Sequence, residues 1–246
     1  MKYLRSVNVI FLCLMLFVPT ASAWHDKTHL AICRAAGFDM WYHCAGPDIA
    51  KVKAGNVESY NHWFNNSAEV EITPQLVFSQ VEHYNKRSKY LDKEGHLPGA
   101  IIASLRAYEK DLKAGKYALY NLVYCAHYIS DLSQPLHNIA NDDFNQEHHN
   151  ANDGIVEESI LNQPEKIKGY MYSIHLSDKD FEADLASEIS RIANISRKLG
   201  YKLRDQKRDM TKREAYVQLG HSASLLRAVL LHYNKIPKVV KETGHD

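Results

Sequence analysis

Apolar residues in much of this chain recur at intervals of three and four, the spacing of one face of an α-helix. The clearest run extends from Lys212 to about Asn234, where Tyr216, Leu219, Ala223, Leu226 and Leu230 fall in line and Pro237 lies beyond the end. The same spacing predicts helices over residues 75–93, 98–113, 117–131 and 180–199, with Gly115 and Gly200 as the expected stops. Few segments show the alternation of apolar and polar residues that is typical of a β-strand. The pattern therefore predicts an all-α fold, built as a single compact multi-helix domain.

Two stretches, 40–66 and 137–154, lack a steady period. They mix Gly, Pro, Asn, Asp, His and Trp, which is typical of loops. We therefore expect a helical scaffold that carries two functional loops.

The first 23 residues have the pattern of a secretory signal. Lys2 and Arg5 precede an apolar run, and Ala21-Ser22-Ala23 is a small-x-small cleavage sequence. The run is about ten residues, whereas roughly 20 are needed to cross a bilayer. We therefore expect cleavage after Ala23, a secreted or periplasmic protein without a transmembrane segment, and a monomeric domain over residues 24–246.

Charge and cysteine content narrow the function classes. Removal of residues 1–23 leaves 28 basic and 29 acidic residues, so the overall charge offers no case for binding duplex nucleic acid. A locally positive site remains open, since bound metals would supply it. Export permits a disulfide, and Cys33 with Cys44 is the favoured pair because Cys125 lies inside a helical pattern. A chain with three free thiols is the alternative.

Five candidate metal ligands fall between positions 127 and 153, in the order H-x3-D-x5-H-x11-H-x3-D. They are His127, Asp131, His137, His149 and Asp153. Side chains four apart on a helix share a face, so the first two can hold one ion. Imidazoles and carboxylates suit zinc, and carboxylates can bridge neighbouring ions. One such pair alone is usually a hydrogen bond or a solvated face, but the whole set predicts metal binding.

Three segments carry a resemblance to a known family. Leu105-Arg-Ala-Tyr-Glu, Gly115-Lys-Tyr and Ala126-His-Tyr-Ile-Ser-Asp-Leu-Ser-Gln-Pro-Leu-His137 resemble the core of the zinc-dependent phospholipase C superfamily, which includes the single-strand-specific zinc nucleases. The resemblance extends over the expected mature chain and is strongest in residues 98–158. It implies an all-helical domain of the phospholipase C and zinc nuclease type with three Zn²⁺ ions.

The resemblance also implies a ligand set. One zinc would be held by Asp48, His62, His127 and Asp131, and a second by His137, His149 and Asp153. The third would be held by the freed amino nitrogen and carbonyl oxygen of Trp24, by His29, and by Asp131 as a bridge. Signal cleavage would thus create a ligand, because the amino group of Trp24 is otherwise part of a peptide bond.

Several of these assignments have alternatives in the sequence. His25 lies near His29, and the family spacing favours His29. His148 precedes His149, but the residue four after His148 is Asn152, a poorer ligand than Asp153. Asp48 follows Gly46-Pro47 and could be a helix cap. Trp63 and Phe64 either line a substrate pocket or belong to the core.

The implied activity is hydrolysis of a phosphodiester by a metal-activated water. We hypothesise that Asp48 acts as the general base. Phospholipase C acting on a phospholipid surface is our first interpretation, and a nuclease acting on single-stranded DNA or RNA is the alternative. A non-catalytic metal-binding protein is a third. Lys27 and Ile49 replace the acid and the tyrosine of choline-selecting relatives, so the headgroup remains open.

Overall fold

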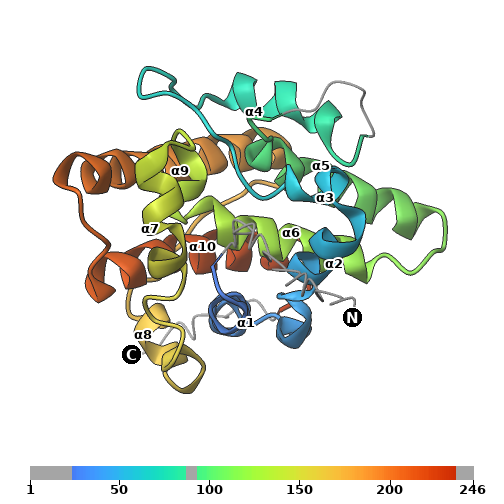
Figure 1. Ribbon diagram of the computed structural model, residues 1–246. Helices are drawn as coiled ribbons and strands as arrows, with labels where there is room; N and C mark the ends of the chain where they lie inside the picture. Colours follow the sequence, from blue (N-terminus) through green and yellow to red (C-terminus); the bar gives the residue numbers. More distant parts are fainter. Residues whose placement is uncertain (1–23, 87–92, 237–246) are drawn as a thin grey trace, which may run out of the picture.

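The computed structural model describes residues 24–86 and 93–236, and within them the chain is all-α, as predicted, without a strand (Figure 1). The α-helices are α1 (Asp26–Ala36), α2 (Gly46–Ala54), α3 (Asn56–Ser59), α4 (Pro74–Gln80), α5 (Leu97–Lys113), α6 (Leu119–Leu132), α7 (Asp143–Asp153), α8 (Pro164–Lys168), α9 (Phe181–Gln206) and α10 (Lys212–His232). Four 3₁₀ helices join them: η1 (Trp41–His43), η2 (Val81–His83), η3 (Pro135–Asn138) and η4 (Ile160–Asn162). The predicted signal, residues 1–23, lies outside the described residues.

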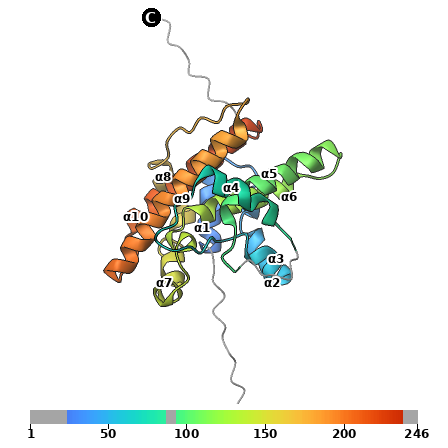
Figure 2. The ribbon, with the colours of Figure 1, turned by 90° about the horizontal axis from the view of Figure 1, so that it is seen from above.

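Helix α6 is the centre of the molecule. It contacts α1, α2, α5, α9 and α10, and Figures 1 and 2 show these helices around it. Every residue from Cys125 to Leu132 is buried, including His127 and Asp131. A helix that is buried all round is enclosed by its neighbours, and polar side chains there must find partners. The centre of the fold therefore already contains two of the predicted ligands.

Local signals start the helices that frame the site. Thr211 accepts a hydrogen bond from the backbone N–H of Glu214, whose side chain accepts one from the backbone N–H of Thr211, so α10 begins with a capping box. Asp142 caps α7 by accepting from the backbone N–H of Asn145. Pro47 occupies the first turn of α2, where its missing N–H costs no helical hydrogen bond.

Two predicted helix ends were wrong. The helix expected over 75–93 ends at Gln80 and continues as η2 to His83, after which Asn85 has a φ of 54°. Helix α9 runs through the expected stop at Gly200 to Gln206. A Cβ at Gly200 would lie 2.7 Å from the Pro135 carbonyl oxygen of η3. Gly200 therefore permits close packing of α9 on η3 rather than ending a helix.

The two expected loops were also partly wrong. The stretch 40–66 contains α2 and α3, and the stretch 137–154 contains α7. Asp48 lies inside the first turn of α2, after Ala45 at the N-cap, so it is not itself the cap residue. These helices are short and polar, so they carry too few apolar residues for a visible period.

The predicted disulfide is present between Cys33 and Cys44, and Cys125 is a buried free thiol. The bridge joins α1 to Cys44, which follows η1 and lies two residues before the start of α2. Both helices carry predicted ligands, so the disulfide ties two sides of the site together. None of the described helices is both long and apolar enough to cross a membrane.

Candidate metal centre

The structure brings the predicted histidines and aspartates together in three adjoining groups, each with ligand atoms within 4.8 Å of one another. The groups are His29 with His127 and Asp131; Asp48 with His62 and His127; and His137 with His149 and Asp153. They come from α1, α2, η3, α6, α7 and the segment after α3, so distant parts of the chain meet here. Eight of the nine predicted ligand residues are present in these groups.

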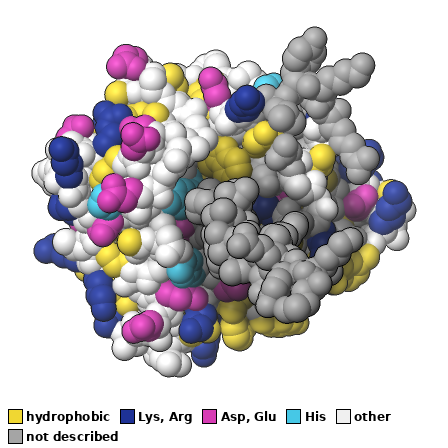
Figure 3. All heavy atoms as spheres, viewed as in Figure 1, with side chains coloured by type: hydrophobic (Ala, Val, Ile, Leu, Met, Phe, Trp, Pro, Cys, Tyr) yellow, Lys and Arg dark blue, Asp and Glu magenta, His cyan; other side chains and the backbone are white. Residues whose placement is uncertain are grey.

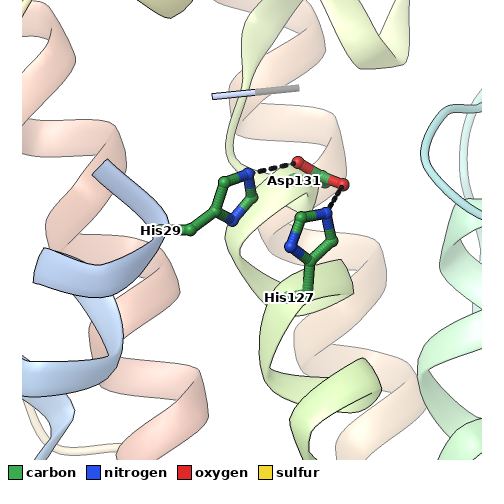
Figure 4. Close-up of side chains that lie close together, drawn as sticks. All are labelled: His29, His127 and Asp131. Carbon is green, nitrogen blue, oxygen red and sulfur yellow. Dashed lines mark ion pairs between the residues drawn. The ribbon is translucent and has the colours of Figure 1, made fainter. Parts of the chain in front are cut away.

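The carboxylate of Asp131 is the point at which the groups meet. Its Oδ2 lies 3.0 Å from His62 Nδ1 and 3.2 Å from His127 Nε2. Its Oδ1 lies 3.4 Å from His29 Nε2 and 3.8 Å from His137 Nδ1. Figure 4 shows one oxygen of Asp131 facing His29 of α1 and the other facing His127 of its own helix. Two oxygens that face different imidazoles are the arrangement a bridging carboxylate needs.

Hydrogen bonds orient the imidazoles toward the centre. His127 Nδ1 donates to the Cys44 carbonyl at 2.6 Å, which leaves its Nε2 facing Asp131. His149 Nδ1 donates to Asn145 Oδ1 at 2.6 Å, which leaves its Nε2 facing His137 and Asp153. Metal-binding histidines characteristically hold their second ring nitrogen in this way, because the contact selects the tautomer and ring orientation.

Carboxylates and amides support the other ligands. Glu58 Oε1 lies 3.3 Å from His62 Nε2 and accepts a hydrogen bond from Tyr128 at 2.7 Å. Gln134 Nε2 donates to Asp153 Oδ1, and Gln134 Oε1 accepts from the backbone N–H of Leu136. These contacts leave His62 Nδ1 and Asp153 Oδ2 facing the centre.

The residues fit metal ions on two grounds. Four buried ligand atoms that face the centre lack a hydrogen-bond partner within the described residues: His29 Nε2, Asp131 Oδ1, His137 Nδ1 and Asp153 Oδ2. Buried polar atoms without partners cost free energy, and a cation would compensate several at once. His62 Nδ1 lies 3.1 Å from His127 Nε2, and His137 Nε2 lies 3.1 Å from His149 Nε2. Two ligands on one tetrahedral zinc lie roughly 3.3 Å apart.

Burial and mutual charge set the protonation of the group. Burial lowers the pKa of His29 to about 3 and that of His137 to about 4, so both rings are neutral near pH 7. Burial also opposes a charge on His127, but the carboxylates of Asp131 and Asp48 outweigh it and raise the pKa to about 9. Neutral imidazoles present lone pairs to a metal without first losing a proton.

The pKa values of two carboxylates of the centre, Asp48 and Asp153, shift in opposite directions. Burial opposes ionisation of Asp48, but nearby His127, His29 and Lys51 outweigh burial and lower its pKa. Burial raises the pKa of Asp153, which lacks comparable cationic partners. A cation bound beside Asp153 would oppose this effect of burial by favouring the ionised carboxylate.

The structure places the neighbouring histidines of each pair in different surroundings. His29 lies within the centre, whereas His25 faces outward and meets Asn150 Oδ1 at 3.2 Å. His149 lies within the third group, whereas His148 pairs with Asp209 at 2.7 Å on the other side of α7. His29 and His149 are also the two histidines that the sequence favoured.

Trp24, Trp63 and Phe64 have different surroundings. The Trp24 side chain is fully buried, and the backbone N–H of the next residue, His25, donates to the Asp153 carbonyl at 3.5 Å. Phe64 is in the hydrophobic core, and its backbone N–H donates to the His137 carbonyl at 2.8 Å. Trp63 is partly exposed and lies edge-on to Tyr60. Phe64 therefore supports the centre from the core side.

Sequence reasoning missed Lys51 and Glu58. Lys51 Nζ lies 2.7 Å from Asp48 Oδ1, and its charge also lowers the pKa values of His137 and Asp153 after the larger effects of burial and other neighbours. The spacing Asp48-x2-Lys51 and Glu58-x3-His62 was visible in the sequence. Such spacing is common on any helix surface, so only the tertiary structure distinguishes these two pairs.

The centre opens to solvent on one side. The side chains of Asp48, Lys51 and His149 are 14%, 12% and 12% exposed, whereas those of His29, His62, His127 and Asp131 are fully buried. The solvent-facing edge of the centre, which we call its opening, is therefore formed by side chains of α2 and α7.

Comparison with known proteins adds no assignment. No family model matches the chain, and no curated protein matches it. The functional assignment of this chain therefore rests on the geometry of its buried histidine and aspartate groups.

Proposed function

We propose that this protein is a zinc-dependent phosphodiesterase, with phospholipase C as the first candidate. The observation that carries the proposal is the Asp131 carboxylate, which lies among four imidazoles and adjoins all three ligand groups. The resemblance of residues 98–158 to the zinc-dependent phospholipase C superfamily supports the same assignment.

The proposed ligand sets are those expected from the sequence. Asp48, His62, His127 and Asp131 would hold one zinc, and His137, His149 and Asp153 a second. His29 and Asp131 would hold the third with the amino nitrogen and carbonyl oxygen of Trp24, once that residue is the first of the chain. Bound zinc ions polarise phosphoryl oxygens and lower the pKa of a coordinated water.

The protein's own residues divide the remaining work. Asp48 is ionised, because its pKa is lowered, and it is partly exposed at the opening, so it is placed to accept a proton from a water molecule. Lys51 beside it is placed to donate to a phosphate oxygen of the entering substrate. The buried imidazoles exclude bulk water from the base of the site.

Charge favours an anionic substrate. Three divalent cations carry six positive charges, and the carboxylates of Asp48, Asp131 and Asp153 return three negative charges. Lys51 adds a further positive charge at the opening. A loaded centre would be strongly cationic in a protein whose total charge is near zero, which suits a phosphate diester.

A single-strand nuclease is the second candidate. Trp63 follows the ligand His62 directly, and its ring is partly exposed. An exposed indole beside a phosphate-binding centre can stack on an unpaired base.

The test is a side-by-side assay of the mature protein on phosphatidylcholine, phosphatidylglycerol and single-stranded DNA. We expect hydrolysis of phospholipid that disappears with a strong chelator and returns with zinc. Hydrolysis of DNA alone would select the nuclease. Activity that survives complete metal removal would refute the metal mechanism, and zinc binding without any turnover would favour the metal-binding protein.

Variants test the arrangement of the centre. Asp131→Asn should lower both zinc content and kcat/KM more than Asp153→Asn, because Asp131 adjoins all three groups; we expect a loss of roughly a hundredfold or more for the first. Asp205→Asn is the matched control, since Asp205 is exposed on α9. Equal effects of Asp131→Asn and Asp153→Asn would contradict the bridging role.

A further inference from the structure

Large apolar side chains are exposed next to the opening of the metal centre. Five of the nine described large hydrophobic residues that are exposed belong to η1, to α2, and to the segment just before α6 and its first turn: Tyr42, Ile49, Val52, Tyr117 and Tyr120. We call these five residues the apolar strip. The exposed fractions of all nine residues range from 37% to 76%, and Val52 of the apolar strip is the most exposed. Isolated apolar residues on a surface are ordinary, but a group of neighbours calls for an explanation.

Ring contacts make part of the strip continuous. The rings of Tyr117 and Tyr120 are 5.2 Å apart, and the ring of His43 lies 6.2 Å from that of Tyr120 and 4.5 Å from that of Tyr42. Between them is a mainly apolar hollow of about 330 Å³, which is lined by His43, Gly46, Pro47, Tyr120, Val123 and Tyr124. Figure 3 shows hydrophobic side chains at the lower right of this face, near the place where Figure 1 draws the start of α6.

Helix α2 connects the strip to the metal centre. Asp48 and Lys51 are three residues apart, so they share the face of α2 that meets the ligands. Ile49 and Val52 are also three apart and share the adjoining, exposed face. One short helix thus carries the rim of the site and an apolar surface side by side.

We propose that the apolar strip docks the protein on a phospholipid surface, with the opening of the metal centre held at the level of the headgroups. Tyrosine concentrates at membrane–water interfaces because its ring is apolar and its hydroxyl remains hydrated, and aliphatic side chains enter the acyl boundary. The inference rests on the proposed phospholipid substrate and adds the surface through which that substrate is reached.

The charges around the strip fit a lipid surface better than a nucleic acid. Lys53 and Lys116 are exposed and adjoin Val52 and Tyr117 in the chain, so each can meet a lipid phosphate. Nucleic-acid surfaces depend on many phosphate contacts from lysine and arginine, whereas the two most exposed members of this strip are the aliphatic Ile49 and Val52. A surface that presents apolar side chains and few cations therefore fits a lipid bilayer better than a nucleic acid.

The experiment compares the zinc-loaded wild-type protein with the triple variant Val52→Ser, Tyr117→Ser and Tyr120→Ser. These side chains are 76%, 61% and 56% exposed, so their replacement leaves the core intact. The matched control is Phe78→Ser with Tyr170→Ser, two exposed hydrophobic residues outside the strip. Binding to vesicles of phosphatidylcholine and phosphatidylglycerol (4:1) is measured by sedimentation, with zinc and with chelator. Hydrolysis of soluble bis(p-nitrophenyl) phosphate is measured in parallel.

We expect the triple variant to lose about tenfold in vesicle binding, equivalent to about 1.4 kcal/mol. The control should bind as the wild type does, and all three proteins should hydrolyse the soluble diester at similar rates. Vesicle binding through the strip without hydrolysis of any diester would support the docking surface and refute the proposed function.

Four results would overturn the docking proposal. These are a wild-type protein that does not bind vesicles, equal vesicle binding by the triple variant, a wild-type dimer that the triple variant dissociates, and loss of single-stranded DNA binding in place of vesicle binding. Hydrolysis of the soluble diester in any of these cases would leave the proposed phosphodiesterase activity intact.

Discussion

Gly200 gives a direct test of how the helical scaffold holds the metal centre. A Cβ at this position would lie 2.7 Å from the Pro135 carbonyl oxygen and 2.8 Å from Ile139 Cγ2. Pro135 begins η3, which carries the ligand His137. Because the nearest atom belongs to the backbone, Gly200→Ala can be accommodated only if α9 and η3 move apart.

The expected size of the effect is a difference of two terms. Alanine in a helix interior is favoured over glycine by about 1 kcal/mol. Overpacking of a close contact costs about 1–3 kcal/mol. The net result should be a loss of about 1 kcal/mol, or roughly 2–4 °C in Tm for a domain of this size. Displacement of His137 should also weaken zinc binding roughly tenfold, as loss of ligand positioning does at other sites.

Gly220→Ala is the matched control. A Cβ at Gly220 would lie 2.6 Å from Tyr170 Cβ and from the Tyr170 carbonyl oxygen, so its contact is equally close but belongs to another part of the fold. Urea unfolding of the metal-free proteins measures stability, and calorimetric titration measures zinc affinity. The two variants should lose similar stability, and only Gly200→Ala should lose zinc affinity.

Two outcomes would refute this reasoning. Gly200→Ala could be more stable than the wild type by about 1 kcal/mol, as helix propensity alone predicts. Alternatively, both variants could reduce zinc affinity to the same extent, which would show that the effect is general rather than transmitted through η3.

The disulfide and the cap of α10 allow two further tests. Replacement of Cys33 and Cys44 by Ser should lower stability by about 3 kcal/mol, since the bridge closes a loop with a sequence separation of 11; unchanged urea midpoints would contradict this. Hydrogen bonds from Arg208 lower the pKa of Glu214 to about 2. Burial opposes this shift, and hydrogen bonds from the backbone and side chain of Thr211 add to it. The pKa of a glutamate in the unfolded chain is about 4.3. The stabilisation by ionised Glu214 should therefore be fully present above that pH and be lost as the pH falls toward 2. Glu214→Gln should remove about 1–2 kcal/mol at pH 7 and flatten that acid dependence, and a variant with the wild-type pH profile would show that the charge is unimportant.

Local order along the chain made part of the centre predictable. His127 and Asp131 lie four residues apart on α6, and this spacing alone places them on one face. The spacing of His149 and Asp153 predicts the same on α7, although that segment was expected to be a loop. Its helix was missed because residues 143–153 include few apolar side chains, so a cap at Asp142 was the main available signal.

The sequence by itself therefore determined the all-α class, the order of the ligand residues and the pairs that share a helix face, because these depend on short-range spacing. Only the tertiary structure decided that Asp131 meets His29, His62 and His137, that Lys51 reaches Asp48, and that Gly200 is a packing contact. Those relations join segments far apart in the chain, and the close packing of α1, α2, α9 and η3 around α6 sets them. The apolar strip is likewise a tertiary property, since its members come from three elements that become neighbours only when the chain folds.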